Sequence, residues 1–273
     1  MPVTRTADSR PTEWQLLTSG EMLSRWLVWL GIVALTVFCW RVMTENTIWA
    51  FVYDAPRQAQ DIFGRMIPPR WSYMDRLWLP LWDTINIATL GTLISIVIAV
   101  PMAFLAARNT TPSTILVRPV ALFVIVSTRS INSLIWGLLL VAVLGPGVLA
   151  GIIAIALRSI GFIGKLLYEA IEEIDERQVE AVRATGASSA QVIAYGIVPQ
   201  VLPAFATITV FRWDINIRES TVLGLVGAGG LGLALESSLN TLAWPQVSLI
   251  LIVILVTVLI SEWITARVRR SII

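Results

Sequence analysis

Long apolar runs separated by short polar stretches dominate the chain after its first 25 residues. A helix needs about 20 apolar residues to cross a bilayer core, because its backbone must satisfy its own hydrogen bonds there. Six runs approach this length, so we predict an all-α integral membrane protein with about six transmembrane helices. The predicted spans are 26–43, 84–107, 119–144, 148–168, a fifth that begins near 199 and is interrupted by charges, and 245–267.

Basic residues are distributed unevenly over the segments that join these spans. With the N-terminus inside, the cytoplasmic segments receive Arg5, Arg10, Arg25, Arg108, Arg118, Arg177, Arg183, Arg267, Arg269 and Arg270. The excess of Arg and Lys in cytoplasmic loops therefore predicts that both termini are cytoplasmic. The segment 45–83 carries four Arg, four Asp and four Trp, a mixture typical of sequence that lies at the membrane interface on the outer side.

Composition narrows the range of functions. Hydrophobic residues make up 56% of the chain and charged residues 14%, against about a quarter charged in soluble domains. The chain has no His, and its single Cys39 excludes an intrachain disulfide. His is the usual acid or base at neutral pH and the commonest metal ligand, so we expect no catalytic residues and no metal site. An intramembrane enzyme is disfavoured for the same reason.

A polar stretch between the predicted fourth and fifth spans has a helical pattern. Residues 169–199 carry many acidic side chains, with apolar residues at helical spacing between them. Gly186 predicts a helix end, and Ser188 with Gln191 matches a capping box that begins a new helix. We predict two short amphipathic helices with a bend at Gly186. The alternative is an ordinary solvated loop between two spans.

The same stretch contains a second motif. Glu180-Ala181-Val182, then Gly186, then Val198-Pro199 is similar to E-A-A-x-x-x-G, with Val182 in place of the motif's second Ala. In this it resembles ABC-importer permease subunits, which carry that motif. The resemblance implies a type I ABC importer permease fold, in which this loop forms coupling helices that sit in a groove of a cytoplasmic ATPase. The residues that it implies for coupling are Glu180, Ala181, Gly186, Ala187 and Ser188.

A finer resemblance concerns one subfamily. "RATGAS", "YGIVPQVLP" and "NIRESTVLGLVGAGGLG" (216–232) resemble permeases of phosphonate-type importers, which take up phosphonates, phosphite or phosphate. Methionine-type permeases are similar only in "GAGGLG". The resemblance implies a homodimer in a bacterial inner membrane, two cytoplasmic ATP-binding subunits and an external solute-binding protein. A methionine-type permease, or a permease for another small solute, and a secondary anion carrier remain alternatives. Which phosphorus oxyanion is preferred stays open.

This organisation divides the chain into four parts. They are a cytoplasmic N-terminal segment 1–25, a first transmembrane helix with an external interfacial loop 26–83, a permease core 84–267 with coupling helices at about 169–199, and a cytoplasmic tail 268–273. The only Gly-Lys pair, Gly164-Lys165, is followed by Leu166 where a P-loop needs a hydroxyl residue. We therefore expect no cofactor on this chain, with ATP and Mg²⁺ on a partner subunit, and no nucleic-acid partner.

Charges inside the predicted spans are the candidates for substrate contact. An Arg at the middle of a span costs roughly 2.5–3.5 kcal/mol, so it needs a partner or a watery path. One interpretation is internal pairing of Arg212 with Asp214 and of Arg218 with Glu219. The other is an Arg-lined passage for an anion, in which Arg129 has no acidic neighbour in sequence and neutral donors surround it. The candidate pathway residues are Arg129, Asn132, Arg212, Asn216, Arg218, Glu219, Ser220 and Thr221.

Gly227, Gly229 and Gly232 spell G-x-G-x-x-G, a fingerprint that also occurs in dinucleotide-binding enzymes. Such a site needs a preceding strand and an acidic residue about 20 positions further on. That position falls within the apolar interior of the predicted sixth span, so the oxidoreductase alternative has no second support. We expect these glycines, with Gly230, to form a close helix contact or a gate.

Overall fold

The computed structural model describes residues 19–45 and 47–272, and helices are the only regular secondary structure in that part of the chain. Most of the predicted N-terminal segment 1–25 lies outside the described residues. The chain divides into two units, 1–61 and 62–273.

The first unit contains α1 (Ser19–Thr44) and most of α2 (Trp49–Met66). α1 is long and apolar enough to cross a membrane, and it begins before the predicted span 26–43. α2 is amphipathic. Trp49, Val52, Tyr53, Pro56 and Phe63 follow one face at helical spacing. The opposite face carries Asp54, Arg57, Gln58, Asp61 and Arg65.

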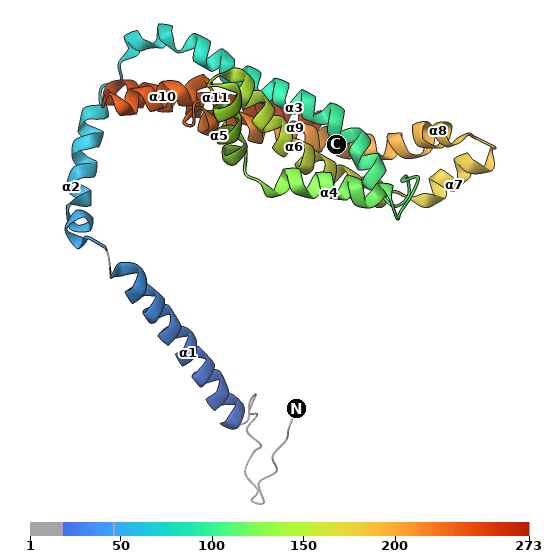
Figure 1. Ribbon diagram of the computed structural model, residues 1–273, viewed down its shortest axis with the longest axis horizontal. Helices are drawn as coiled ribbons and strands as arrows, with labels where there is room; N and C mark the ends of the chain where they lie inside the picture. Colours follow the sequence, from blue (N-terminus) through green and yellow to red (C-terminus); the bar gives the residue numbers. More distant parts are fainter. Residues whose placement is uncertain (1–18, 46, 273) are drawn as a thin grey trace, which may run out of the picture. The chain divides into compact units, whose positions relative to one another are not determined.

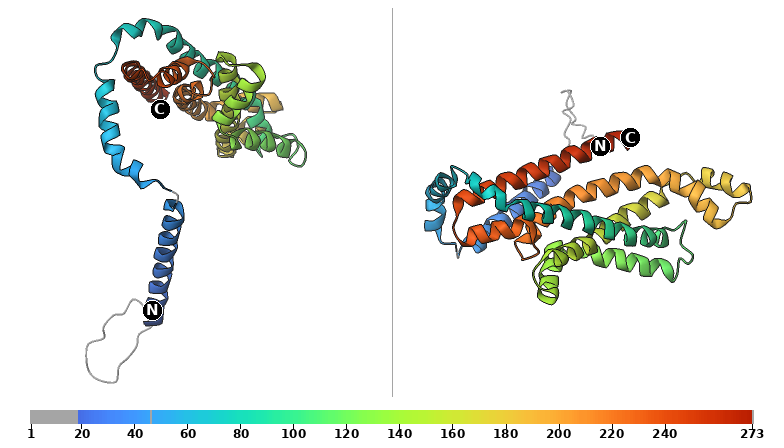
Figure 2. Two further views of the ribbon diagram at one scale, coloured as in Figure 1. Left: turned by 60° about the vertical axis from the view of Figure 1, so that its left-hand side comes forward. Right: turned by 90° about the horizontal axis from the view of Figure 1, so that it is seen from above.

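The second unit is a bundle of helices (Figure 1). Its elements are the 3-10 helix η1 (Trp71–Arg76), α3 (Trp78–Ala106), α4 (Val117–Ser130), α5 (Ser133–Leu144), α6 (Val148–Glu172), α7 (Glu176–Ala184), α8 (Ser189–Val192), the π-helical turn η2 (Ile193–Ile197), α9 (Val198–Gly224), α10 (Gly230–Asn240) and α11 (Trp244–Ile272). α3 and α6 pack along each other most extensively, and α9 packs against both. α11 lies along α9 and α10 (Figure 2).

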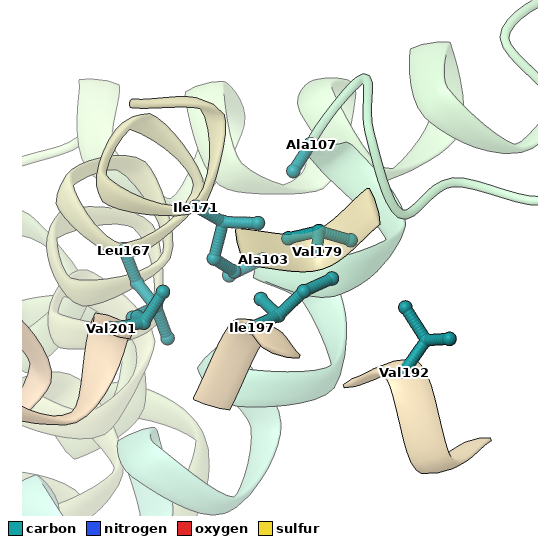
Figure 3. Close-up of a cluster of buried hydrophobic side chains, with 8 residues drawn as sticks. All are labelled: Ala103, Ala107, Leu167, Ile171, Val179, Val192, Ile197 and Val201. Carbon is teal, nitrogen blue, oxygen red and sulfur yellow. The ribbon is translucent and has the colours of Figure 1, made fainter. Parts of the chain in front are cut away.

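One end of the bundle carries α7 and α8. Here a cluster of buried apolar side chains joins the last turns of α3 and α6 to α7, α8 and the start of α9 (Figure 3). α4 begins at this same end, because Arg118 pairs with Glu172 at 3.4 Å and its Nε donates to the Ala106 carbonyl at 2.9 Å. At the other end, the Gly147 amide donates to the Gly227 carbonyl at 3.0 Å, so α6 begins beside the turn that follows α9.

The predicted third span 119–144 is wrong as a single helix. It is two helices, α4 and α5, which meet at an angle of 88°. Asn132 accounts for the break, because its side chain accepts a hydrogen bond from the Leu134 amide and caps α5. α4 has 14 residues and α5 has 12, so they measure about 21 and 18 Å, and each is too short to cross alone. Because α4 begins at the α7 end and α5 leads to the opposite end, the pair crosses the bundle once.

The predicted interruption of the fifth span is also wrong, because α9 continues unbroken through its charged residues to Gly224. α3 begins at Trp78, six residues before the predicted span, and the short helix α10 was not predicted at all. Five helices of the described chain are long and apolar enough to cross a membrane, and the bent pair makes six. The predicted fold class, all-α with about six spans, is confirmed.

Candidate functional site

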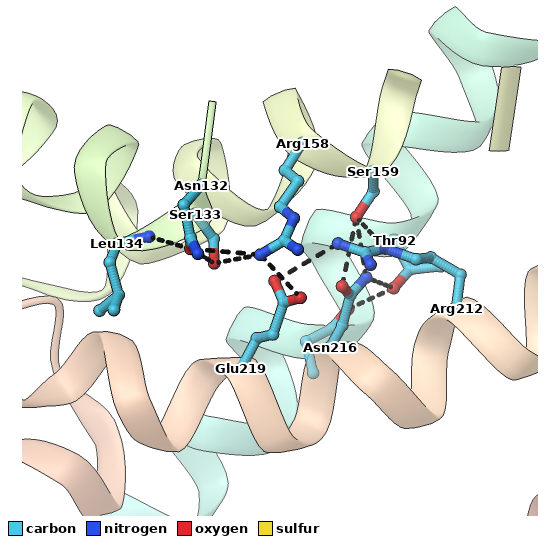
Figure 4. Close-up of polar contacts among 10 residues, drawn as sticks. Thr92, Asn132, Ser133, Leu134, Arg158, Ser159, Arg212, Asn216 and Glu219 are labelled. Carbon is cyan, nitrogen blue, oxygen red and sulfur yellow. Dashed lines mark hydrogen bonds and ion pairs between the residues drawn. The ribbon is translucent and has the colours of Figure 1, made fainter. Parts of the chain in front are cut away.

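Arg212 lies near the middle of α9 with its side chain only 2% exposed. Its Nε donates to the Ser159 hydroxyl at 2.9 Å, and its guanidinium lies 5.0 Å from the centroid of the Phe162 ring, both on α6. Asn216, one turn further along α9, donates to Thr92 of α3 at 2.7 Å and to Ser159 at 3.1 Å. A polar network therefore ties together the middles of α3, α6 and α9 (Figure 4).

Glu219 joins this buried network to a second Arg. Its Oε2 lies 3.4 Å from Arg212 Nη2, and its Oε1 lies 3.1 Å from Arg158 Nη1. The same Arg158 nitrogen donates to Asn132 Oδ1 and to Ser133 Oγ, each at 3.2 Å. Arg158 is 30% exposed at its side chain, whereas Glu219 is 16% exposed. The break between α4 and α5 is thereby linked to α6 and α9 through one guanidinium group (Figure 4).

A second ion pair lies on a different face of α9. Arg218 pairs with Asp214, one helical turn before it, and the Ser261 hydroxyl of α11 donates to Asp214 at 2.7 Å. The predicted pairs 212–214 and 218–219 are therefore wrong, because the observed partners are 212–219 and 214–218. Residues one or two positions apart on a helix point in different directions, whereas residues four or seven apart share a face.

An open cavity of about 600 Å³ lies beside these charges. Its lining residues come from α5, α6, α9 and the turn before α5. They are Asn132, Ser133, Leu134, Arg158, Phe211, Ile215, Arg218, Glu219 and Val222. Arg158 and Arg218 bring two guanidinium groups to it, and Glu219 one carboxylate. Guanidinium groups offer forked donors that match the oxygens of phosphorus oxyanions, so the cavity has the chemistry to bind one weakly.

The sequence candidates are divided between this cavity and the packed interior. Asn132, Arg218 and Glu219 line the cavity, and Arg212 contacts Glu219 behind it. Ser220 and Thr221 are buried and donate to the Ile217 and Arg218 carbonyls of their own helix at 2.8 and 2.7 Å. They bind backbone groups, as the side chains of helical Ser and Thr commonly do.

Arg129 lies apart from this arrangement. It lies in the last turn of α4, its side chain is exposed, and it does not line the cavity. The expectation that Asn132 and Asn216 surround Arg129 is wrong, because Asn132 contacts Arg158 and Asn216 contacts Thr92 and Ser159. Arg158 falls inside the predicted span 148–168 but is not among the pathway residues predicted from the sequence. The polar run 127–133, which interrupts an apolar span, was the signal for the break that Arg158 contacts.

The helix pair predicted near 169–199 is present in part, because α7 is a separate short helix whereas α8 continues through η2 into α9 as one helical run, Ser189–Gly224. α7 ends at Ala184, and Gly186 follows with φ +78°, a backbone conformation that favours glycine. The Ser188 amide donates to Gln191 Oε1 at 2.8 Å, which is the Gln half of the predicted capping box. A shallow surface hollow of about 670 Å³ lies between the two helices, lined by Ala181, Val182, Thr185, Gly186, Ala187, Gln191 and Tyr195. Glu180 lines a neighbouring hollow with Arg183.

The glycine cluster forms the turn between α9 and α10. Gly227, Gly229 and Gly230 have φ between +71° and +87°. A Cβ at Gly232 would lie 1.9 Å from the Thr221 carbonyl oxygen, so α10 contacts α9 more closely than any larger residue allows. The Leu231 amide donates to Thr84 Oγ1 of α3 at 2.8 Å. The expected close helix contact is confirmed. Among the described residues a helix and not a strand precedes the glycines, unlike in a dinucleotide-binding site. The gate stays a prediction.

The profile of one protein family, "Binding-protein-dependent transport system inner membrane component", matches residues 99–273. The chain belongs to this family. It is 43% identical over 208 residues to the phosphite transport system permease protein PtxC of Stutzerimonas stutzeri, an alignment that covers 76% of this chain and 75% of that protein. It is 44% identical over 209 residues to the phosphate-import permease protein PhnE of Mycolicibacterium smegmatis, over 77% of this chain and 39% of PhnE. These relatives confirm the resemblance to phosphonate-type permeases.

Solved structures of other transporters share the fold of this permease. The MetNI methionine ABC transporter in an inward-facing conformation matches with a TM-score of 0.65 and 21% identity, over 75% of this chain and 99% of that chain. An amino acid ABC transporter with histidines matches with a TM-score of 0.62 and 20% identity, over 73% of this chain and 95% of that chain. By sequence, a probable D-methionine permease, MetI of Vibrio cholerae, is 30% identical over 86 residues, 32% of this chain. The phosphite and phosphate relatives therefore match far more of the permease than the methionine relative does.

Proposed function

We propose that this permease carries a phosphorus oxyanion, either a phosphonate, phosphite or phosphate, through the cavity lined by Arg158 and Arg218. The net positive charge of the site is the main support for this proposal. Three guanidinium groups, on Arg158, Arg212 and Arg218, stand against the two carboxylates of Asp214 and Glu219, which leaves one positive charge. Because an isolated charge in a membrane interior is costly, a net positive site there favours an anionic ligand. The 43% identity to a phosphite permease agrees with that chemistry.

The proposed transport unit contains two copies of this chain. The cavity is open on the surface of the single chain, and the apolar side chains at its edge include Phe211 and Val222, which are 40% and 43% exposed. A second copy related by a two-fold axis would cover this apolar edge and enclose the guanidinium groups between the subunits. The resulting passage would then be closed to lipid.

The proposed energy source is a pair of cytoplasmic ATP-binding subunits that dock on α7 and α8. The exposed hollow around Gly186 offers a surface for them, and Glu180, Ala181, Ala187 and Ser188 belong to the same helix pair or its bend. ATP and Mg²⁺ would bind those subunits, and this chain would bind no cofactor and catalyse no reaction. An external solute-binding protein would deliver the anion. The proposed assembly includes no nucleic acid.

The proposed orientation places the α7 end of the bundle in the cytoplasm. Arg108, Arg118, Arg177 and Arg183 lie at or near this end, which agrees with the excess of basic residues in cytoplasmic loops. α11 ends with Arg267, Arg269 and Arg270, which agrees with a cytoplasmic C-terminus. Six crossings return the chain to the side on which it began, so the N-terminus would be cytoplasmic as well.

Reconstitution tests the proposal. The permease, its ATPase and its binding protein are placed in proteoliposomes, and uptake of phosphite, phosphate, methylphosphonate and methionine is compared with and without ATP. We expect uptake of at least one phosphorus oxyanion that requires ATP, and no uptake of methionine. Uptake that persists without ATP would instead indicate a secondary anion carrier, and methionine uptake would refute the proposed substrate class.

A further inference from the structure

We infer that Glu219 is an internal counter-ion, which the transported anion displaces from Arg158 and which returns when the anion leaves. The inference rests on the proposed function. Glu219 contacts two Arg side chains with different surroundings, so its two contacts can be broken independently. One contact is part of the packed interior and the other lines the cavity.

The contact with Arg212 is the permanent one. Arg212 is held by the Ser159 hydroxyl at 2.9 Å and by the Phe162 ring at 5.0 Å, and only 2% of its side chain is exposed. Removing Glu219 from it would leave a buried charge without a carboxylate, which is strongly unfavourable. An anion in the cavity has little access to this guanidinium group.

The contact with Arg158 is the exchangeable one. Arg158 is 30% exposed and lines the cavity, and its Nη1 atom lies 3.1 Å from Glu219 and 3.2 Å from both Asn132 Oδ1 and Ser133 Oγ. Three acceptors therefore share the donors of one nitrogen. An oxyanion that enters the cavity brings charged oxygens to the same guanidinium group. It can compete with the Glu219 carboxylate because both form charge-assisted hydrogen bonds, which the neutral oxygens of Asn132 and Ser133 do not.

Displacement does not leave Glu219 unpaired. When Arg158 turns to the anion, Glu219 keeps its contact with Arg212, so the carboxylate stays compensated within the bundle. After the anion leaves, Arg158 regains its internal partner. This arrangement lowers the affinity of the cavity for its substrate by competition, which suits a transporter that must release what it binds. It also favours solutes with a full negative charge, because a neutral solute cannot replace a carboxylate at Arg158.

The experiment measures equilibrium binding of [³³P]phosphate to the permease–ATPase complex in nanodiscs, in the absence of binding protein. Glu219→Gln keeps the shape of the side chain and removes its charge. We expect it to bind phosphate at least tenfold more tightly than the wild type and to release it correspondingly more slowly. Glu262→Gln removes an acid from the exposed face of α11 and serves as the control, with wild-type affinity.

A second variant guards against misassembly of the first. Glu219→Asp keeps the charge but shortens the side chain, so it should bind both Arg residues less well and give an intermediate increase in phosphate affinity. Wild-type or weaker affinity in either variant would overturn the role of Glu219. The wild-type uptake assay separates the two ideas, because its failure refutes the proposed function, whereas normal uptake with unchanged binding by the Glu219 variants refutes only this inference.

Discussion

Arg212 keeps its charge in the interior of the bundle because protein groups replace the water that it has lost. A carboxylate, a hydroxyl and an aromatic ring surround its guanidinium group. These contacts orient α6 relative to α9, so Arg212 has a structural role in addition to its charge. Arg158 and Arg218, with side chains 30% and 48% exposed, are the Arg residues that reach the cavity.

Replacing Arg212 with Met should therefore destabilise the fold. Loss of one partner from a buried ion pair costs about 3–5 kcal/mol, and we expect about 3 kcal/mol because Arg158 still compensates Glu219. Unfolding of the purified permease by SDS in mixed micelles measures the change. Arg129→Met, on the exposed end of α4, is the control and should change stability by less than about 0.5 kcal/mol. Equal stability of the two variants would contradict the structural role of Arg212.

The charged residues of α9 are evident from the sequence, but the pairing predicted for them was wrong. It identified Arg212, Asp214, Arg218 and Glu219 together, yet it paired them by closeness in sequence. Pairing by helical geometry requires a continuous helix, and the expected interruption of the fifth span removed that constraint. The partnership of Arg158 with Glu219 depends on how α6 packs against α9, which no local pattern specifies.

At the scale of elements, α7 and α8 form the surface proposed to receive the ATPase. Gly186, with φ +78°, forms the bend between them. A Cβ added to Gly186 would point into open space, because no atom lies within 4 Å of its position. A side chain at this position would therefore project toward the docking partner without disturbing the bundle itself.

Gly186→Asp should uncouple the permease from its ATPase. We expect the variant to insert and fold normally but to lose the stimulation of ATP hydrolysis by loaded binding protein, because a charged side chain strains the bend and enters the contact. ATPase activity in nanodiscs measures this. Gly64→Asp, at an open position on α2, is the matched control and should retain stimulation. Wild-type stimulation in the Gly186 variant would refute the proposed docking surface.

α2 should lie on the outer membrane surface with its apolar face in the lipid. It begins five residues after α1 ends, so a helix that crosses the membrane holds its start at the interface. Spin labels are attached to single cysteines in a Cys39→Ser background. We expect the label at Val52 or Phe63 to collide more often with O₂ and the label at Asp54 with a water-soluble nickel complex. Protection of Val52 and Phe63 from both reagents would indicate contact with protein instead.

The apolar pattern of the sequence predicts neither the break in the third span nor the short helix α10. Hydropathy measures the length of a run, and the run 119–144 is long enough for one helix. The break depends on Asn132, whose side chain caps α5, and on the Arg158 contact that holds the break in place. By contrast, the bend at Gly186 follows from local chemistry alone, and it was predicted correctly.

At the scale of the whole molecule, six crossings and the basic residues of the α7 end give one proposed orientation. The broken span counts as a single crossing because it joins opposite ends of the bundle, where Arg118 contacts Glu172 and Gly147 contacts Gly227. In that orientation the charged network lies near the middle of α3, α6 and α9, at the depth where transporters commonly bind substrate. The fold class and the family followed from the sequence, whereas the cavity required the packing of α5, α6 and α9.

The proposed transport requires Arg158 and Arg218 to bind a phosphorus oxyanion during ATP-driven import. The most direct measurement is ATP-dependent [³³P]phosphate or phosphite uptake by proteoliposomes that contain the reconstituted complex, with Arg158→Gln and Arg218→Gln compared against Arg129→Gln. We predict that each cavity variant assembles with its ATPase but loses at least nine tenths of its uptake, while Arg129→Gln transports at the wild-type rate. Wild-type uptake by both assembled cavity variants would contradict this role of Arg158 and Arg218.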